Sequence, residues 1–250
     1  MFGGITRMPH YRGSDEHHLY VLPLPYVIYR GKIVQADRDG VRGIFVANRH
    51  FESSLSVNGN PPVSSDNEAR QGMPDLGAVG EVGPSLKWFF QERGSPRGWC
   101  LRTALRAAAS LDDGHLSYRG LHGGLNLLYD DSSRWDTARI RYGVNLGVDL
   151  ADTRYNRYFY GVAEEYRRPN RSAYAAAGGY GGCGLSAYAA RRITRSFSIG
   201  LFARWDNLAG AVFEDSPLVR RENDLILATA LIWRIAESRT MVPWNRDLGR

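Results

Sequence analysis

The stretch ARIRYGVNLGVDL, residues 138–150, decides the fold. Apolar and polar residues alternate along it from end to end. In an α-helix, Ile140 and Val144 would lie nearly opposite Tyr142 and Leu146, so no polar face would remain. A strand instead places every second side chain on the same face. The period of two therefore predicts a β-strand with one apolar and one polar face.

The same alternation recurs along most of the chain and predicts an all-β, antiparallel protein of about 12 strands, or about 10 to 14 given the usual boundary error. Several of these stretches exceed the usual strand of about 5 to 6 residues. They match the roughly 9 to 11 residues with which a tilted strand crosses a hydrocarbon layer. Alternation does not say which face points inward, so a soluble sandwich also fits this pattern. The predicted strands lie near residues 2–8, 19–30, 32–37, 41–47, 50–57, 79–91, 98–110, 115–129, 135–150, 172–190, 195–207 and 224–235.

The connections between the predicted strands differ strongly in length. In an up-and-down order, the long polar connections all fall at the same end of the sheet. Outer-membrane barrels have this asymmetry, with short periplasmic turns and longer outer loops. The sequence therefore favours an antiparallel up-and-down transmembrane β-barrel over residues 1–235, followed by a C-terminal tail over residues 236–250. The long connections are Pro9–His18, Asn58–Ala78, Ala151–Arg171 and Leu208–Asn223.

Composition narrows the class further. The chain has 250 residues, of which 43% are hydrophobic and 12% aromatic, and such a chain is too rich in apolar residues to be disordered. No run of about 18 apolar residues offers a transmembrane helix. The net charge is +6, and all but Lys32 and Lys87 of the 32 basic residues are Arg, which suits anionic partners. These arginines are spread along the chain, so nucleic-acid binding is not expected.

The two ends and the two cysteines give weaker information. The start, Met1 to Gly4, has neither a basic segment nor an apolar core, so we expect a cytosolic protein or the mature or truncated form of an exported one. Cys100 and Cys183 are too few for a disulfide scaffold, and the sequence leaves open whether they pair.

Several ordered segments resemble the MltA-interacting protein family, MipA/OmpV. No single segment is a catalytic signature, but together they extend from about residue 9 to residue 235. The segments are PHYRGSD (9–15), LPLPY (22–26), GMPDL (72–76), EVGPSL (81–86), YGV (160–162) and DSPLV (215–219).

This resemblance implies an outer-membrane β-barrel of Gram-negative bacteria, surrounded by lipid and lipopolysaccharide. It also implies a non-enzymatic scaffold that links a murein lytic transglycosylase to a penicillin-binding peptidoglycan synthase in cell-wall remodelling. Two features depart from the family pattern: the first strand is short at its start, and Trp233-Arg234-Ile235 precedes a tail where an aromatic terminus is usual. We expect the tail, with Arg239, Trp244 and Arg246, to contact periplasmic partners.

If the chain forms a barrel, the polar face of its strands lines the lumen. There the charged residues either fill the interior with ion pairs or leave a narrow polar passage. A ring of arginines would favour anions. A narrow outer-membrane pore for small, including anionic, solutes is therefore the first alternative function, and a soluble β-barrel or sandwich that binds a ligand is the second. The lumen-facing candidates are Arg102, Arg106, Arg139, Arg141, Asp149, Arg204, Asp206 and Arg234.

The other motifs give only weak indications of a cofactor, metal or catalytic site. Gly179–Gly184 fits G-x-G-x-x-G with Asp206 beyond it, but no β-branched strand precedes it, so a dinucleotide site is not favoured. Asp15–His18 offers metal-ligand residue types, yet neighbouring side chains on an extended chain point in opposite directions. Ser14 and His17 lack an acid that would orient a catalytic base. The sequence predicts no cofactor, metal or catalytic residue, and places His115 and His122 in solvent or in the lumen.

Overall fold

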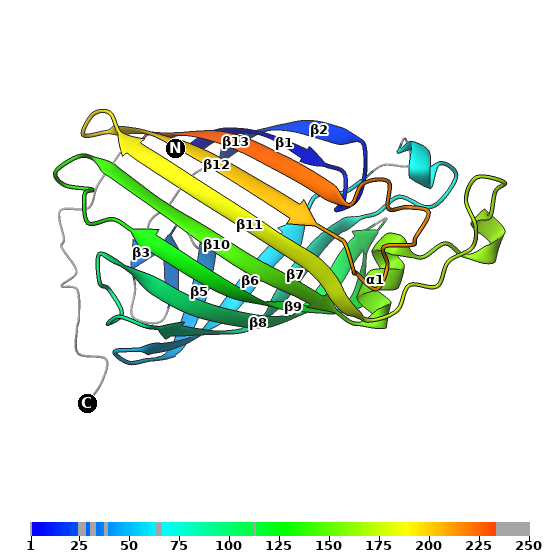
Figure 1. Ribbon diagram of the computed structural model, residues 1–250, viewed down its shortest axis with the longest axis horizontal. Helices are drawn as coiled ribbons and strands as arrows, with labels where there is room; N and C mark the ends of the chain where they lie inside the picture. Colours follow the sequence, from blue (N-terminus) through cyan, green and yellow to red (C-terminus); the bar gives the residue numbers. More distant parts are fainter. Residues whose placement is uncertain are drawn as a thin grey trace.

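The computed structural model describes residues 2–24, 29–30, 34–37, 40–63, 67–112 and 114–233. Its strands form one 13-stranded sheet, in which β2, β1 and β13 are followed by β12 down to β3 in descending order (Figure 1). The strands are β1 (Phe2–Pro9), β2 (His17–Leu24), β3 (Tyr29–Arg30), β4 (Val34–Asp37), β5 (Gly40–Ala47), β6 (Phe51–Asn60), β7 (Ala78–Phe89), β8 (Arg97–Asp112), β9 (His115–Asp131), β10 (Ile140–Ala151), β11 (Gly179–Arg192), β12 (Phe197–Asn207) and β13 (Asn223–Trp233). The helices are η1 (Glu68–Arg70), α1 (Thr153–Tyr160) and η2 (Glu164–Tyr166).

The antiparallel all-β prediction is confirmed, and each predicted strand region contains a described strand. The region 19–30 contains two, β2 and β3, on either side of residues 25–28, which lie outside the described part of the chain. Every neighbouring pair in the sheet is antiparallel. The β1–β13 pairing brings the first and last described strands together, and β2 and β3 lie at the two edges of the sheet.

The apolar face of the sheet points outward. In β10, Leu146 is 53% exposed, whereas Gly143 on the other face is buried. Leu146 pairs with Leu127 of β9 and Leu185 of β11, and Leu185 is exposed as well. A soluble sandwich buries the apolar faces of two sheets against each other. The described strands form a single sheet with the opposite orientation: its apolar face is exposed, and charged side chains occupy its covered face.

The main apolar core lies outside the sheet. It is built by the loop cap, which we define as the four long connections 10–16, 61–77, 152–178 and 208–222 in their described parts. These connections converge at one end of the sheet, as the sequence predicts (Figure 1). The Phe213 ring stacks on the Tyr160 ring with a centroid distance of 3.7 Å. Most of the buried cluster belongs to the cap: Tyr11, Val63, Ala69, Met73, Leu76, Tyr155, Phe159, Tyr160, Val162, Ala176, Leu208, Ala211, Phe213 and Leu218.

Two strands begin later than predicted, one at each end of the sheet. β11 starts at Gly179, since Ala176 is fully buried in the cap and Tyr174 makes an isolated bridge to Val162. β10 starts at Ile140, after Arg139 adopts a left-handed conformation with φ of 60° that ends the preceding turn.

The helix α1 was not expected within the long connection 151–171. Asp152 caps it by accepting a hydrogen bond from the Tyr155 backbone N–H at 2.7 Å. Tyr155 and Phe159 lie one turn apart and pack into the cap. A capping Asp followed by aromatic residues four positions apart is the sequence signal for this helix.

Replacing Phe213 by Ala should loosen the loop cap without unfolding the sheet. The Phe213 ring is 2% exposed, and its removal leaves a cavity and deprives the Tyr160 ring of its stacking partner. We therefore expect the cap to lose about 3 to 5 kcal/mol of stability. Hydrogen exchange should then accelerate in the cap and stay slow in the strands. Phe90→Ala is the matched control, because Phe90 is 55% exposed; equal exchange in both variants would contradict the cap as a packed unit.

Candidate functional site

The covered face of the sheet holds most of the predicted lumen-facing residues. Their neighbours on the same strands point to the other face and are exposed, as Leu101 and Leu105 of β8 are. Arg139 lies in the turn before β10, is exposed, and donates to the Ile193 carbonyl at 3.4 Å. Arg234 lies outside the described residues. The residues on the covered face are Arg102 and Arg106 of β8, Arg141 and Asp149 of β10, and Arg204 and Asp206 of β12.

Three of these residues form an ion-pair cluster with an arginine from the loop cap. Arg204 binds Asp206 through two hydrogen bonds, of 2.8 and 2.7 Å, in the bidentate geometry that suits a guanidinium. Arg12 reaches from the cap to Asp149 at 2.9 Å and to Asp206 at 3.3 Å. Asp206 is 1% exposed, and such a buried carboxylate is tolerated only when it is paired. Two positive and two negative charges therefore neutralise each other and fasten the cap to β10 and β12.

A second cluster surrounds Glu81 of β7, which is 1% exposed. Tyr155 of α1 donates to Glu81 Oε1 at 2.9 Å, and His122 Nδ1 of β9 lies 3.0 Å from Glu81 Oε2. The imidazole stacks on the Tyr155 ring with a centroid distance of 4.7 Å. His122 Nε2 lies 3.8 Å from Asp149 Oδ1, so this cluster continues into the first.

Arg106 connects the Glu81 cluster to β6. Its Nε donates to Ser56 Oγ at 2.9 Å, and its Nη1 lies 3.8 Å from Glu81 Oε2. We call the joined clusters the polar network: Arg12, Ser56, Glu81, Arg106, His122, Asp149, Tyr155, Arg204 and Asp206. Its carboxylates are saturated by donors within the protein, so the arrangement locks the cap and strands together.

Sequence reasoning missed five members of the polar network: Arg12, Ser56, Glu81, His122 and Tyr155. Glu81 carries a usable signal, because it alternates with apolar Val82 and so belongs to the polar face. The sequence places His122 in solvent or in the lumen but does not identify Glu81 and Asp149 as its partners. Arg12 lies in a loop and Tyr155 on the short helix α1, both outside the alternating strands, so only the folded cap brings them to the sheet.

The weaker motifs take part in ordinary packing. Gly179–Gly184 opens β11, whose neighbours β10 and β12 are both antiparallel, so it is not the strand–helix turn of a dinucleotide site. Ser14 is buried and accepts from Asn67 Nδ2 at 3.1 Å, while His17 Nε2 lies 3.9 Å from Asp224. Within the described ranges, no group of three or more His, Cys, Asp or Glu residues could hold a metal ion. Cys100 and Cys183, on β8 and β11, are not joined by a disulfide in the described structure.

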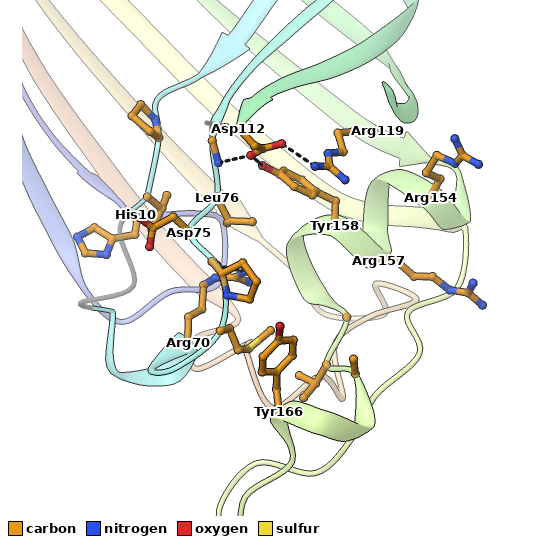
Figure 2. A pocket seen from close by; sticks show the side chains of 18 of the residues that line it. His10, Arg70, Asp75, Leu76, Asp112, Arg119, Arg154, Arg157, Tyr158 and Tyr166 are labelled. Carbon is orange, nitrogen blue, oxygen red and sulfur yellow. Dashed lines mark hydrogen bonds and ion pairs between the residues drawn. The ribbon is translucent and has the colours of Figure 1, made fainter. Parts of the chain in front are cut away.

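A pocket of about 1700 Å³ opens in the loop cap (Figure 2). It lies between residues 61–78, the hairpin of β8 and β9, and α1 with the segment that follows it. Asp112 at its wall accepts from the Gly77 backbone N–H at 3.0 Å and from Tyr158 Oη at 3.2 Å, and it pairs with Arg119. Arg154 and Arg157 point away from this group (Figure 2). Among the side chains drawn, Tyr158 and Arg119 are thus bonded to Asp112, and the charged groups of the pocket do not converge on one point.

Burial also changes the acidity of tyrosines in the cap. It raises the pKa of Tyr11 to about 12, and the phenol donates to the Leu218 carbonyl at 2.9 Å. Burial, followed by the nearby Glu81 carboxylate, raises the pKa of Tyr155 well above its usual value. These phenols are therefore held in the neutral form, as hydrogen-bond donors.

The family model of MltA-interacting protein MipA matches residues 2–235 of the chain. The chain belongs to the MipA family. The match covers every described strand from β1 to β13 and the whole loop cap, so the resemblance seen in the sequence is confirmed. No curated protein and no solved structure matches the chain significantly. None of the described helices is long and apolar enough to span a membrane. The C-terminal tail predicted from the sequence, residues 236–250, follows the matched region and lies outside the described residues.

The cap of this MipA-family chain should lose stability in alkali. The pKa of Tyr11 is higher in the folded state, about 12, than the value near 10 of an unfolded chain, so the folded cap retains a proton that the unfolded chain releases. The stabilisation is complete below about pH 10 and is lost as the pH rises toward 12. Limited proteolysis of the cap against pH should show this loss, with tyrosinate absorbance recorded in parallel. Tyr11→Phe should weaken the pH dependence; an unchanged profile would contradict the assignment.

Proposed function

We propose that this MipA-family chain is a non-enzymatic outer-membrane β-barrel that acts as a scaffold for the lytic transglycosylase MltA and a peptidoglycan synthase. Membership of a family described as MltA-interacting supports the first partner. The single observation that carries the membrane part is the outward apolar face of a one-sheet protein, because such a face needs an apolar solvent. The second partner, a peptidoglycan synthase, is proposed only because the sequence resembles the MipA/OmpV family.

The geometry of β2 and β3 supports closure into a barrel. Because all neighbouring strands are antiparallel, these two edge strands of the sheet run in the same direction. Only residues 25–28 separate them, whereas parallel neighbours need a crossover of about a dozen residues or more. We infer that the sheet closes between its two edges, of which β2 pairs with β1 and β3 pairs with β4. Such closure would give a barrel of about 12 strands.

The two ends of the sheet suggest its orientation. The loop cap occupies one end, and short turns connect the strands at the other (Figure 1). Outer-membrane barrels keep their short turns in the periplasm and their long loops outside. β1 begins and β13 ends at the short-turn end. A periplasmic cell-wall enzyme would therefore meet the short turns and the tail beyond β13.

The interior favours a scaffold over a pore. The polar network crosses the covered face from β6 to β12, and the cap packs an apolar core over one end. Both features obstruct passage of solutes. A family that is described by its interaction with MltA also supports a non-enzymatic role.

A charge on the outward face tests the membrane part. Leu185 lies midway along β11 and is 47% exposed, so Leu185→Arg should cost about 2 to 4 kcal/mol if the face meets lipid near the bilayer midplane. Unfolding in urea, followed by the gel shift of the folded barrel in lipid vesicles, would measure this cost. Thr194→Arg in the adjacent turn is the control. Equal stability of both variants would contradict a lipid-facing β11.

The scaffold part is tested by isolating the full chain from outer membranes in mild detergent and identifying what co-purifies, with an unrelated barrel as control. Enrichment of MltA and a peptidoglycan synthase is the expected result. Conductance in planar bilayers without enrichment of either enzyme would replace the scaffold by a solute pore. Folding of the chain in plain buffer without detergent would favour a soluble binding protein.

A further inference from the structure

We propose that the short turns form a docking surface for an acidic patch on a protein partner. This inference rests on the proposed scaffold function and names the site at which it operates. We define the turn rim as residues 48–50, 90–97, 132–139 and 191–196, which lie at the end of the sheet opposite the loop cap (Figure 1).

Hydrogen bonds between neighbouring turns make the turn rim one continuous unit. The Arg93 backbone N–H donates to the Arg49 carbonyl at 2.6 Å. The Ser132 backbone N–H and hydroxyl both reach the Pro96 carbonyl, at 2.7 and 2.9 Å. The Arg192 backbone N–H donates to the Arg139 carbonyl at 2.8 Å. Turns that are fixed to each other lose little conformational entropy when a partner binds.

A tryptophan fixes the longest turn of the rim. The Trp135 ring lies under the guanidinium groups of both Arg141 and Arg192, at 4.8 and 5.0 Å from its centroid. Arg192 also donates to the Trp135 carbonyl at 2.7 Å. Asp131 accepts from the Ser133 backbone N–H at 2.9 Å at the start of the turn. These contacts preorganise the segment that carries Arg134 and Arg139.

The rim exposes an excess of positive charge. Its six exposed arginines face only two exposed acids, Glu92 and Asp136, among the described residues of these turns. Nearby acids are already engaged: Glu52 is buried and pairs with Arg93 at 3.1 Å, and Asp130 accepts from Tyr188. The exposed arginines are Arg49, Arg97, Arg134, Arg139, Arg191 and Arg195.

The loop cap lacks this excess, although it is also rich in arginine. Exposed acids lie among its exposed arginines, as in the Arg167–Glu164 pair at 2.9 Å. The exposed arginines of the cap are Arg154, Arg157, Arg167, Arg168, Arg220 and Arg221, and its exposed acids are Asp15, Glu68, Asp75, Glu164, Glu165, Glu214, Asp215 and Glu222. The net charge of the chain is thus unevenly distributed between its two ends.

The positive charge of the turn rim favours a partner with an acidic surface. Exposed arginines on a rigid surface pair with carboxylates through two hydrogen bonds and steer an acidic protein to the correct face. A protein partner is favoured over the murein polymer because the family is described by its interaction with MltA. The attraction should weaken as salt screens it.

The test compares three variants of the full chain in detergent, with MltA from the same organism as the probe. The first combines Arg49→Glu, Arg134→Glu and Arg195→Glu in the rim. The matched control combines Arg154→Glu, Arg157→Glu and Arg220→Glu in the cap, with the same change in charge. The third replaces the three rim arginines by Lys. Gel shift confirms that each variant is folded.

The rim reversal should weaken the affinity for MltA at least about tenfold and flatten its salt dependence, while the cap control keeps the wild-type affinity. The Lys variant keeps the charge but not the two-bond pairing, so its affinity should lie between those of the wild type and the rim reversal. Failure of the wild-type chain to bind MltA would overturn the proposed function itself. Binding that survives the rim reversal, or that is lost only when residues 236–250 are deleted, would overturn the turn rim as the docking surface. The proposed scaffold function would then still stand. Rim-dependent binding to purified murein in place of MltA would overturn the protein partner.

Discussion

Neutralisation of buried charge on the covered face of the sheet is the constraint on which the rest of the structure depends. Once the apolar side chains point outward, the charged residues of the same strands are enclosed. Ionised groups in such a place are stable only with close partners of opposite charge. The carboxylates of Glu81 and Asp206, each 1% exposed, are therefore the points around which strands and cap must be arranged.

This constraint explains why the long connections fold over the sheet. Arg12 and Tyr155 belong to the loop cap, yet their polar ends complete the partners of Asp149, Asp206 and Glu81. The cap in turn gains an apolar core, including the stacked pair Tyr160 and Phe213, that no single connection could form alone. Charge pairing and apolar packing thus hold the same loops in place, and loosening one weakens the other.

The sequence predicts the strands well because their period of two is local. The stretch around β10 reads correctly without any knowledge of its neighbours. The beginnings of β10 and β11 were misplaced, because the left-handed turn at Arg139 and the burial of Ala176 depend on contacts distant in the chain. Only part of the polar network could be predicted from the sequence. Alternation places Asp149 and Arg204 on the polar face, but Arg12 and Tyr155 lie outside the alternating segments, so no periodic pattern identifies them.

The two ends of the sheet follow from different physical requirements. An end that carries long loops can bury apolar area, so its exposed charges need only keep it solvated, and acids and arginines mix there. Short turns bury little, and they are held instead by backbone hydrogen bonds and by the stacking of Arg141 and Arg192 on Trp135. Arg93 and Arg192 serve this folding, whereas the exposed arginines of the same turns keep their charge at the surface. The end with short turns is therefore both fixed by backbone hydrogen bonds and rich in exposed arginines.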